Sequence, residues 1–161
     1  MNCPACRNYL QQIVVEDITL DVCEGGCGGI WFDNYELKKF DEPHEPAGEA
    51  LNIKRDDNLS IDHSPQRPCP KCDGVIMMRH FFSVKYEVEV DECGQCGGIW
   101  LDYGELEKIR GLFETEADRV QAAKNNFEEL FAEVFADSET DSADTQEKAG
   151  RFAGLFSFFA P

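Results

Sequence analysis

Eight cysteines stand in four close pairs, and this spacing is typical of thiolate ligands for a metal ion. The pairs are Cys3/Cys6, Cys23/Cys27, Cys69/Cys72 and Cys93/Cys96. Four thiolates suit the tetrahedral, redox-silent coordination of Zn²⁺, and close pairs of this kind occur in structural zinc sites. No odd thiol is left for a nucleophile or an intermolecular disulfide. The cysteines therefore predict two four-thiolate metal sites.

The cysteine pairs belong to an internal duplication of the chain. Each copy has a cysteine pair, a β-rich stretch, a second pair and a shared motif. Gly28-Gly29-Ile30-Trp31-Phe32-Asp33 returns as Gly97-Gly98-Ile99-Trp100-Leu101-Asp102, and Glu36-Leu37 returns as Glu105-Leu106. Each repeat alone is too short to bury a self-sufficient core, so we expect each to need its metal ion in order to fold.

Apolar and polar residues alternate ahead of the second cysteine pair in both copies, which predicts β-strands. In the second copy the predicted strand runs from residue 84 to residue 91, with residues 75–78 as its hairpin partner. In the first copy residues 18–22 and 10–15 are the corresponding strands. Each unit is therefore expected to form a knuckle, a hairpin and a second knuckle.

The shared motif after the second pair is expected to serve geometry and packing. Glycines allow the chain to turn tightly around a metal-bound sulfur, because they accept positive φ and close backbone approach. Trp31 and Trp100 are predicted to pack beside the thiolates and shield them. Asp33 and Asp102 are predicted helix N-caps, each with a glutamate three residues later, and not catalytic groups.

The run from Cys-Pro-x-Cys to Cys-x-x-Cys-Gly-Gly-Ile-Trp-Leu-Asp-x-Gly-Glu-Leu resembles the bacterial zinc-ribbon family of the transcription factor IIB type. Residues 69–106 match it closely, and residues 3–37 match it except that Glu24-Gly25-Gly26 separate the second cysteine pair. The resemblance implies one ion bound by Cys3, Cys6, Cys23 and Cys27 and another bound by Cys69, Cys72, Cys93 and Cys96. Exchange of ligands between repeats is the alternative, although each repeat carries a complete set. The family label points to transcription, but such a fold hosts unrelated functions.

The expected fold is a small metal-stabilised α+β protein. It has two tandem zinc ribbons, each with a knuckle, a β-hairpin, a knuckle and a short helix, followed by a long C-terminal helix and an acidic tail. The predicted segments are ribbon 1 at 1–40, an acidic Pro-containing linker at 41–66, ribbon 2 at 67–112, an amphipathic helical extension at 113–137, and an acidic linker with a Phe-rich tail at 138–161. Residues 103–136 form either one helix or two, because Gly111 favours a kink and Thr115 with Asp118 favours a new N-cap.

The chain is strongly acidic, with a formal net charge of −17. Four thiolates around each Zn²⁺ would add negative charge, and such a molecule repels phosphate, so we do not expect nucleic-acid binding. The exception to this acidity is a group of basic residues interleaved with aromatic ones. Its members are Arg67, Lys71, Arg79 and Lys85, which we interpret as ordinary solvated charges on strands.

Two segments are candidates for binding a protein partner. Apolar residues recur at three- and four-residue steps along a predicted helix at 106–135, and Phe152, Leu155, Phe156 and Phe159 would share one helical face of the tail 151–161. The apolar face of this helix packs either on the ribbons or on the same helix of a second chain. A homodimer is therefore one of the two alternatives. The tail folds back on the chain or docks on a partner. Attachment to a membrane surface ranks third, because the neighbouring charges are mainly acidic, and the tail is too short to span a membrane.

The expected function is that of a zinc-binding protein with two structural four-cysteine ribbons, acting as a protein-interaction or scaffold module. One alternative is a nucleic-acid-binding transcription accessory factor. Another is a rubredoxin-like iron electron carrier, because thiolate ligands alone do not exclude iron. The expected cofactor is therefore Zn²⁺, two per chain, with iron as the alternative.

No catalytic pattern stands out in the sequence. There is no Gly-rich phosphate loop, nucleophile elbow or His-Glu metalloprotease helix, so we do not expect an enzyme. A thiol-redox or chaperone activity of the close cysteine pairs is the alternative. His44, His63 and His80 are expected to be surface residues and not ligands or bases. Nothing near Met1 resembles a signal peptide, which favours the cytoplasm, where paired cysteines are more often metal ligands than disulfides.

Overall fold

The computed structural model describes residues 1–45 and 47–138 of the chain. The predicted tail at 151–161 lies outside the described residues. The fold is α+β, with an antiparallel sheet and two helices. Its elements are β1 (Gln11–Val15), β2 (Ile18–Val22), β3 (Ile30–Phe32), the 3-10 turns η1 (Leu37–Lys39) and η2 (Gly48–Leu51), β4 (Met78–Phe81), β5 (Glu89–Glu92), β6 (Ile99–Leu101), α1 (Glu105–Leu112) and α2 (Glu116–Ser138).

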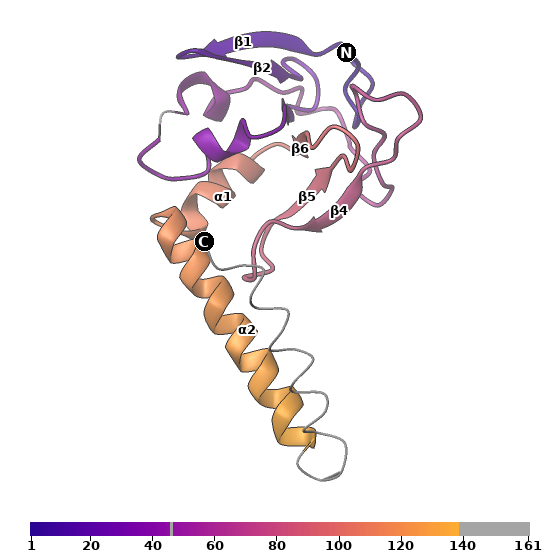
Figure 1. The fold of residues 1–161 in the computed structure, drawn as a ribbon. Coiled ribbons are helices and arrows are strands. Elements are labelled where there is room, and N and C mark those ends of the chain that lie inside the picture. The colour runs from indigo at the N-terminus through magenta and orange to yellow at the C-terminus, as the bar shows by residue number, and fades with distance from the viewer. Residues whose placement is uncertain (46, 139–161) are drawn as a thin grey trace. The chain divides into compact units, whose positions relative to one another are not determined.

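The six strands form one sheet, in the order β1-β2-β3-β6-β5-β4, to which each repeat contributes three strands. At its centre β3 pairs with β6, and Trp31 lies opposite Trp100. Figure 1 shows β1 and β2 of the first repeat on one side of β6, and β5 and β4 of the second repeat on the other. The two repeats are thus joined in one continuous sheet.

The chain divides into two compact units, Met1–Val120 and the residues from Gln121 onward. The first unit holds both repeats, and its apolar interior has two parts. One part lies between the sheet, the segment after the first repeat and α1, and it includes Leu20, Phe32 and Ile109. The other part contains Trp31 and Trp100 together with cysteines of both repeats. The cysteine sites are therefore built into the core.

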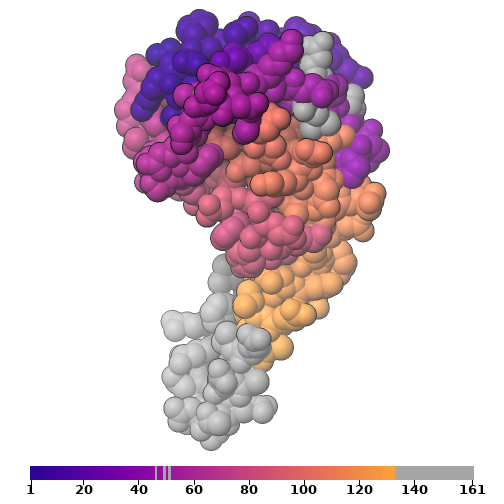
Figure 2. Space-filling view, turned by 180° about the vertical axis from the view of Figure 1, so that it is seen from behind, coloured from indigo at the N-terminus to yellow at the C-terminus, as the bar shows by residue number. Residues whose placement is uncertain are grey.

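The segment expected as a linker, 41–66, packs against the sheet. Its apolar residues Ala47, Ala50 and Ile53 are buried in the core. Arg110 of α1 secures the start of this segment by donating hydrogen bonds to the carbonyl oxygens of Phe40, Pro43 and Glu45. In Figure 2 this purple to magenta part of the chain lies between the indigo first repeat and the orange residues around α1.

The second hairpin differs from the predicted register. Strand β4 begins at Met78, and the expected partner 75–78 mainly supports the knuckle, where the Cys69 N–H donates to the Val75 carbonyl oxygen at 2.8 Å. The first half of the predicted strand at 84–91 is the hairpin turn, with Tyr86 at φ 53°. Of the residues with period-two alternation, only those in β5 therefore form a strand.

The helices also differ in detail from the sequence expectation. In the first repeat the short helix is only the 3-10 turn η1, and Pro43, which disfavours helical backbone just before it, follows soon after. In the second repeat α1 ends at Leu112 and is followed by Phe113, whose backbone is extended; Thr115 then accepts a hydrogen bond from the Asp118 N–H at the start of α2. The break therefore falls after Gly111. None of the described helices is long and apolar enough to cross a membrane.

Candidate metal centres

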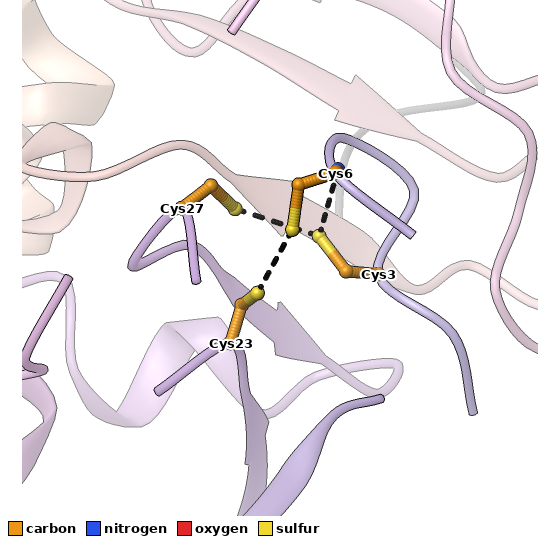
Figure 3. A group of neighbouring side chains, drawn as sticks. All are labelled: Cys3, Cys6, Cys23 and Cys27. Atoms are coloured by element: carbon orange, nitrogen blue, oxygen red, sulfur yellow. Dashed lines mark hydrogen bonds between the residues drawn. The ribbon is translucent and has the colours of Figure 1, made fainter. Parts of the chain in front are cut away.

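Four cysteines of the first repeat converge on one point. The Sγ atoms of Cys3, Cys6, Cys23 and Cys27 all lie within 4.8 Å of one another. Cys3 Sγ is 3.4 Å from Cys27 Sγ, and Cys6 Sγ is 3.3 Å from Cys23 Sγ. Figure 3 shows the four side chains directed toward a common centre. A tetrahedral zinc with Zn–S bonds of about 2.3 Å places its sulfurs roughly 3.8 Å apart, so the cluster has the right size.

The second repeat builds an equivalent cluster. The Sγ atoms of Cys69, Cys72, Cys93 and Cys96 also lie within 4.8 Å of one another, with 3.9 Å between those of Cys69 and Cys96. All eight cysteines singled out in the sequence fall into these two groups. Each group takes its ligands from one repeat, so the repeats do not exchange ligands.

The first cysteine pair of each repeat forms a tight knuckle whose backbone points N–H groups at sulfur. In the first repeat the N–H groups of Ala5 and Cys6 donate to Cys3 Sγ, each at 3.4 Å. In the second repeat those of Lys71 and Cys72 donate to Cys69 Sγ, at 3.4 and 3.2 Å. Such hydrogen bonds favour the thiolate form and orient the ligand toward the metal.

The enlarged second knuckle of the first repeat is accommodated by two glycines. Gly25 adopts a φ of +70°, and a β-carbon on Gly26 would lie 2.6 Å from Cys23 Sγ. The loop is held from outside, because the Gly25 N–H donates to the Lys54 carbonyl oxygen and the Asp56 N–H donates to the Gly26 carbonyl oxygen. The extra residue therefore leaves the four-sulfur geometry intact.

Close packing of the four thiols within each site gives them very different pKa values. In the first site hydrogen bonds from Cys27 and Cys3 lower the pKa of Cys23 to about 2, while the hydrogen bond to Cys23 raises the pKa of Cys3 to about 12. In the second site burial raises the pKa of Cys69 to about 12, and backbone N–H groups outweigh burial and lower the pKa of Cys93 to about 7. Four thiolates this close need a cation between them, so metal binding releases protons.

Both tryptophans lie beside the metal sites and bond to the next acidic residue. Trp31 Nε1 donates to Asp33 Oδ1 at 3.0 Å, and Trp100 Nε1 donates to Asp102 Oδ1 at 2.8 Å. The prediction that these aspartates are helix N-caps is wrong, because the buried indole N–H groups use their carboxylates. The glutamates three residues later do contact the aspartate backbone, because the Asp33 N–H donates to Glu36 at 2.8 Å and the Asp102 N–H donates to Glu105 at 2.7 Å.

Each of these aspartates also pairs with a cation near the first knuckle of the second repeat. Lys71 Nζ lies 2.7 Å from Asp33 Oδ2 and so links the two repeats. The Arg67 guanidinium, whose side chain is 2% exposed, donates to Asp102 Oδ2 at 2.7 Å and has Asp91 Oδ2 at 3.4 Å. Hydrogen bonds from Trp100 and Arg67 outweigh burial and lower the pKa of Asp102. Sequence reasoning missed these pairs, because the partners are distant along the chain.

The basic group of the second repeat makes contacts within the protein. Besides Arg67 and Lys71, Arg79 pairs with Asp91 at 3.1 Å. Lys85 Nζ donates to the Leu112 carbonyl oxygen and lies 4.2 Å from the centre of the Phe113 ring. The three histidines are at or near the surface beside carboxylates; the pairs are His44 with Glu42, His63 with Asp102 and His80 with Glu92.

Two four-cysteine clusters, each joined to a small β-hairpin, define a protein of the zinc-ribbon class. The chain matches the zinc-ribbon family of the TFIIB type, described as a transcription factor zinc-finger, over residues 2–42 and 68–110. These matches cover just over half of the chain, and the protein belongs to this family. No curated protein and no solved structure matches it. The two clusters, in a zinc-ribbon protein, fit two Zn²⁺ per chain.

Zinc in these clusters would have a structural role. Bound Zn²⁺ supplies a tetrahedral link between the four sulfurs and neutralises part of their charge. Cys3, Cys6, Cys23 and Cys27 would hold one ion, and Cys69, Cys72, Cys93 and Cys96 the other. The cysteines of each repeat come from two knuckles that a hairpin separates in sequence, and they pack in one buried cluster with Trp31 and Trp100.

Proposed function

We propose that this zinc-binding protein is a protein-interaction or scaffold module and not an enzyme. Four cysteines close each coordination sphere, whereas a catalytic zinc keeps a position for water or substrate. The clusters are also part of the core, since Cys3, Cys23 and Cys93 are fully buried. The metal sites thus support a surface, and the function lies in what that surface binds. A cytoplasmic location belongs to the same proposal, because thiols stay reduced there.

The apolar surface of α2 is the observation that carries this proposal. The stripe expected over residues 106–135 divides into two parts. Leu106, Ile109 and Leu112 of α1 are buried, whereas large apolar residues of α2 are exposed, including Val120 and Leu130, the latter 51% exposed. Val120, Ala123, Phe127 and Leu130 follow one another at steps of three, four and three residues, which places them on one face of a helix. An exposed apolar face of this kind suits a protein partner, including a second copy of α2.

Nucleic acid is a poor candidate for the partner. The net charge of −17 repels phosphate, and this repulsion weakens only as salt screens it. The basic residues that could have formed a local phosphate site contact carboxylates, a carbonyl oxygen and an aromatic ring of the protein itself. We therefore propose that the transcription label of the family does not extend to direct binding of DNA or RNA by this chain.

A comparison of two matched variants tests the proposal. Leu130→Asp puts a charge on the apolar face of α2, and Gln121→Asp puts the same charge on an exposed polar position of the same helix. Proteins that co-purify with the tagged wild-type chain from its native cells should be lost with Leu130→Asp and retained with Gln121→Asp. Light scattering on the purified chains shows whether the lost partner is a second copy.

Two results would contradict the proposal. One is an identical set of co-purified proteins for both variants and the wild type. The other is submicromolar, salt-sensitive binding of random oligonucleotides in an anisotropy assay, which would favour the nucleic-acid alternative.

A further inference from the structure

A groove of about 270 Å³ lies beside the sheet within the unit Met1–Val120. Its apolar walls are Phe82, Val90 and Ile99 of the second repeat and Leu37 of the first. Phe82 and Ile99 are only partly buried, although both pack against the core. Apolar surface of the core is therefore accessible to another molecule at this place.

The internal duplication gives this groove a counterpart of only about 60 Å³. Gly97, Ile99 and Leu37 line the groove, and the equivalent Gly28, Ile30 and Leu106 line the counterpart. The counterpart is also lined by Ala50 and Ile53, which belong to the segment after the first repeat. A piece of the chain itself thus fills most of the space that the groove leaves open.

The segment 47–56 covers the first repeat with an apolar part and a basic part. Its buried apolar residues are Ala47, Ala50 and Ile53. The basic pair that follows lies along the second cysteine knuckle, where the Gly25 N–H donates to the Lys54 carbonyl oxygen at 2.7 Å. The Arg55 guanidinium lies 4.5 Å from the centre of the Tyr103 ring. The cover is therefore a short apolar stretch followed by two cations.

The equivalent surface of the second repeat is open among the described residues. Gly94 and Gln95 of its second knuckle are exposed, whereas Gly26 of the first repeat is buried. Ile99 is partly buried, whereas its equivalent Ile30 is only 4% exposed. One of two equivalent surfaces is covered by a peptide segment, and the other is available for one.

The charges at the groove favour a basic occupant over an acidic one. Three carboxylates line it, those of Asp33, Asp41 and Glu92, together with the cations of Lys38 and Arg119. Arg119 already pairs with Glu116 at 2.6 Å. Asp33 likewise pairs with Lys71 at 2.7 Å. The remaining carboxylates outnumber Lys38, and the net charge of −17 on the chain adds to the attraction for a cation.

Tyr35 presents an exposed aromatic ring at the groove. Its φ is 69°, at the place where the second repeat has Gly104 with a φ of 80°. The left-handed region strains a tyrosine, and glycine would avoid the strain. The ring is 71% exposed, so its burial does not offset this cost. Lys38 Nζ lies 5.9 Å from the ring centre, at the limit of a cation–π contact, so the ring is suited to a closer cation from a bound segment.

We propose that the groove binds a short segment of a partner protein in which small apolar residues are followed by Lys or Arg. The precedent is the chain's own segment 47–56, which occupies the equivalent surface of the first repeat. The apolar residues of the partner would pack on Phe82 and Ile99, and its cations would lie beside Tyr35 and the carboxylates. The groove shares no lining residue with the apolar face of α2, so it is a second surface, beyond the one in the proposed function.

A synthetic peptide with the sequence of residues 47–56 is the probe for this surface. In an NMR titration of the full-length, zinc-loaded protein it should shift the backbone amide signals of Ile99 and Gln95. The signal of Tyr9, which does not line the groove, should stay in place. A control peptide with Glu in place of both Lys54 and Arg55 should bind roughly tenfold more weakly, because it reverses the favourable charges.

Two variants of the protein separate binding from folding. Tyr35→Gly should weaken binding of the peptide by roughly tenfold, the loss typical of an aromatic anchor, and leave the fold at least as stable, because glycine accepts the positive φ. Lys38→Glu should strengthen binding by about two- to fivefold, since it adds a carboxylate at an exposed site. Tyr9→Ala, which removes an equally exposed ring outside the groove, should leave the affinity unchanged.

Four outcomes would overturn the inference. One is the absence of shifts at the groove with excess peptide, and another is shifts confined to the first repeat around Ile30. A third is Tyr35→Gly binding the peptide as tightly as the wild type. The fourth is groove signals that move with protein concentration before peptide is added, which would assign the groove to a second copy. Leu130→Asp should bind the peptide like the wild type, so failure of the proposed function and failure of this inference are distinguishable.

Discussion

Trp31 of the first repeat covers Gly98 of the second, so closely that a β-carbon on Gly98 would lie 2.1 Å from Cζ2 of the Trp31 ring. The duplication repeats this contact in reverse, with Trp100 covering Gly29 at 2.2 Å. The two indoles lie opposite each other where β3 pairs with β6. Each repeat therefore completes the core of the other, and we expect the two repeats to fold as one unit.

Gly98→Ala should destabilise the protein by about 1–3 kcal/mol, because the added methyl group overlaps a buried ring that cannot move aside freely. Denaturant unfolding with saturating zinc measures this change in the free energy of unfolding. Gly111→Ala is the matched control. Its β-carbon meets nothing within 4 Å, and it lies in α1, where alanine stabilises a helix by up to about 1 kcal/mol. Equal stability of the two variants would show that the Trp31 contact is not tight.

Gly26→Ala should weaken zinc binding at the first site. The new methyl group would press on Cys23 Sγ at 2.6 Å, and disturbance around a zinc ligand lowers affinity by roughly tenfold or more. Competition with a chelator measures the two affinities. Gly94→Ala changes the second knuckle, where the nearest atom is the Met78 methyl group at 3.6 Å, and should retain both ions. Zinc held by Gly26→Ala as tightly as by the wild type, or lost from Gly94→Ala as readily as from Gly26→Ala, would contradict this account of the enlarged knuckle.

Arg67→Met should destabilise the protein by about 3 kcal/mol, because it leaves the buried Asp102 carboxylate without its arginine, while Asp91 keeps its pair with Arg79. Lys71→Met removes the equivalent partner of Asp33. That pair is about half exposed, so its loss should change stability by at most about 1 kcal/mol. Thermal or denaturant unfolding of both variants at neutral pH compares them. A larger effect for Lys71 than for Arg67 would reverse the assignment of the buried pair.

Glu105 should make the protein less stable as the pH rises toward neutrality. Burial raises its pKa from 4.5 to about 7 in the folded protein. Between these values the folded state holds a proton that the unfolded state has lost, so the stability contribution is largest at low pH and declines until about pH 7. Glu105→Gln keeps an acceptor for the Asp102 N–H. Its free energy of unfolding, relative to that of the wild type, should rise from pH 5.5 to 7.5 and then stay constant. Glu36→Gln is the matched control from the first repeat. A difference between Glu105→Gln and the wild type that is constant over this range would refute the linkage.

The metal sites could be predicted from the sequence, because a cysteine knuckle is a local structure and its spacing directly limits the ligand geometry. The strands beside Cys23 were also readable from their alternation. The pairing of β3 with β6 was not, since three-residue strands carry almost no pattern and their partners come from different repeats. The packing of Ala47, Ala50 and Ile53 was hidden by the prolines and charges around them. The acceptor role of Asp33 and Asp102 depends on buried indole groups, which local capping rules do not consider.

Native mass spectrometry during removal of zinc by a chelator tests the central claim most directly, that two zinc ions hold two repeats in one sheet. The account predicts two zinc ions per chain at the start and a scarce one-zinc species during removal, with both repeats unfolding together because Trp31 and Trp100 pack across the repeat boundary. Fewer than two zinc ions, iron in their place, or an abundant one-zinc chain with one repeat still folded would contradict it.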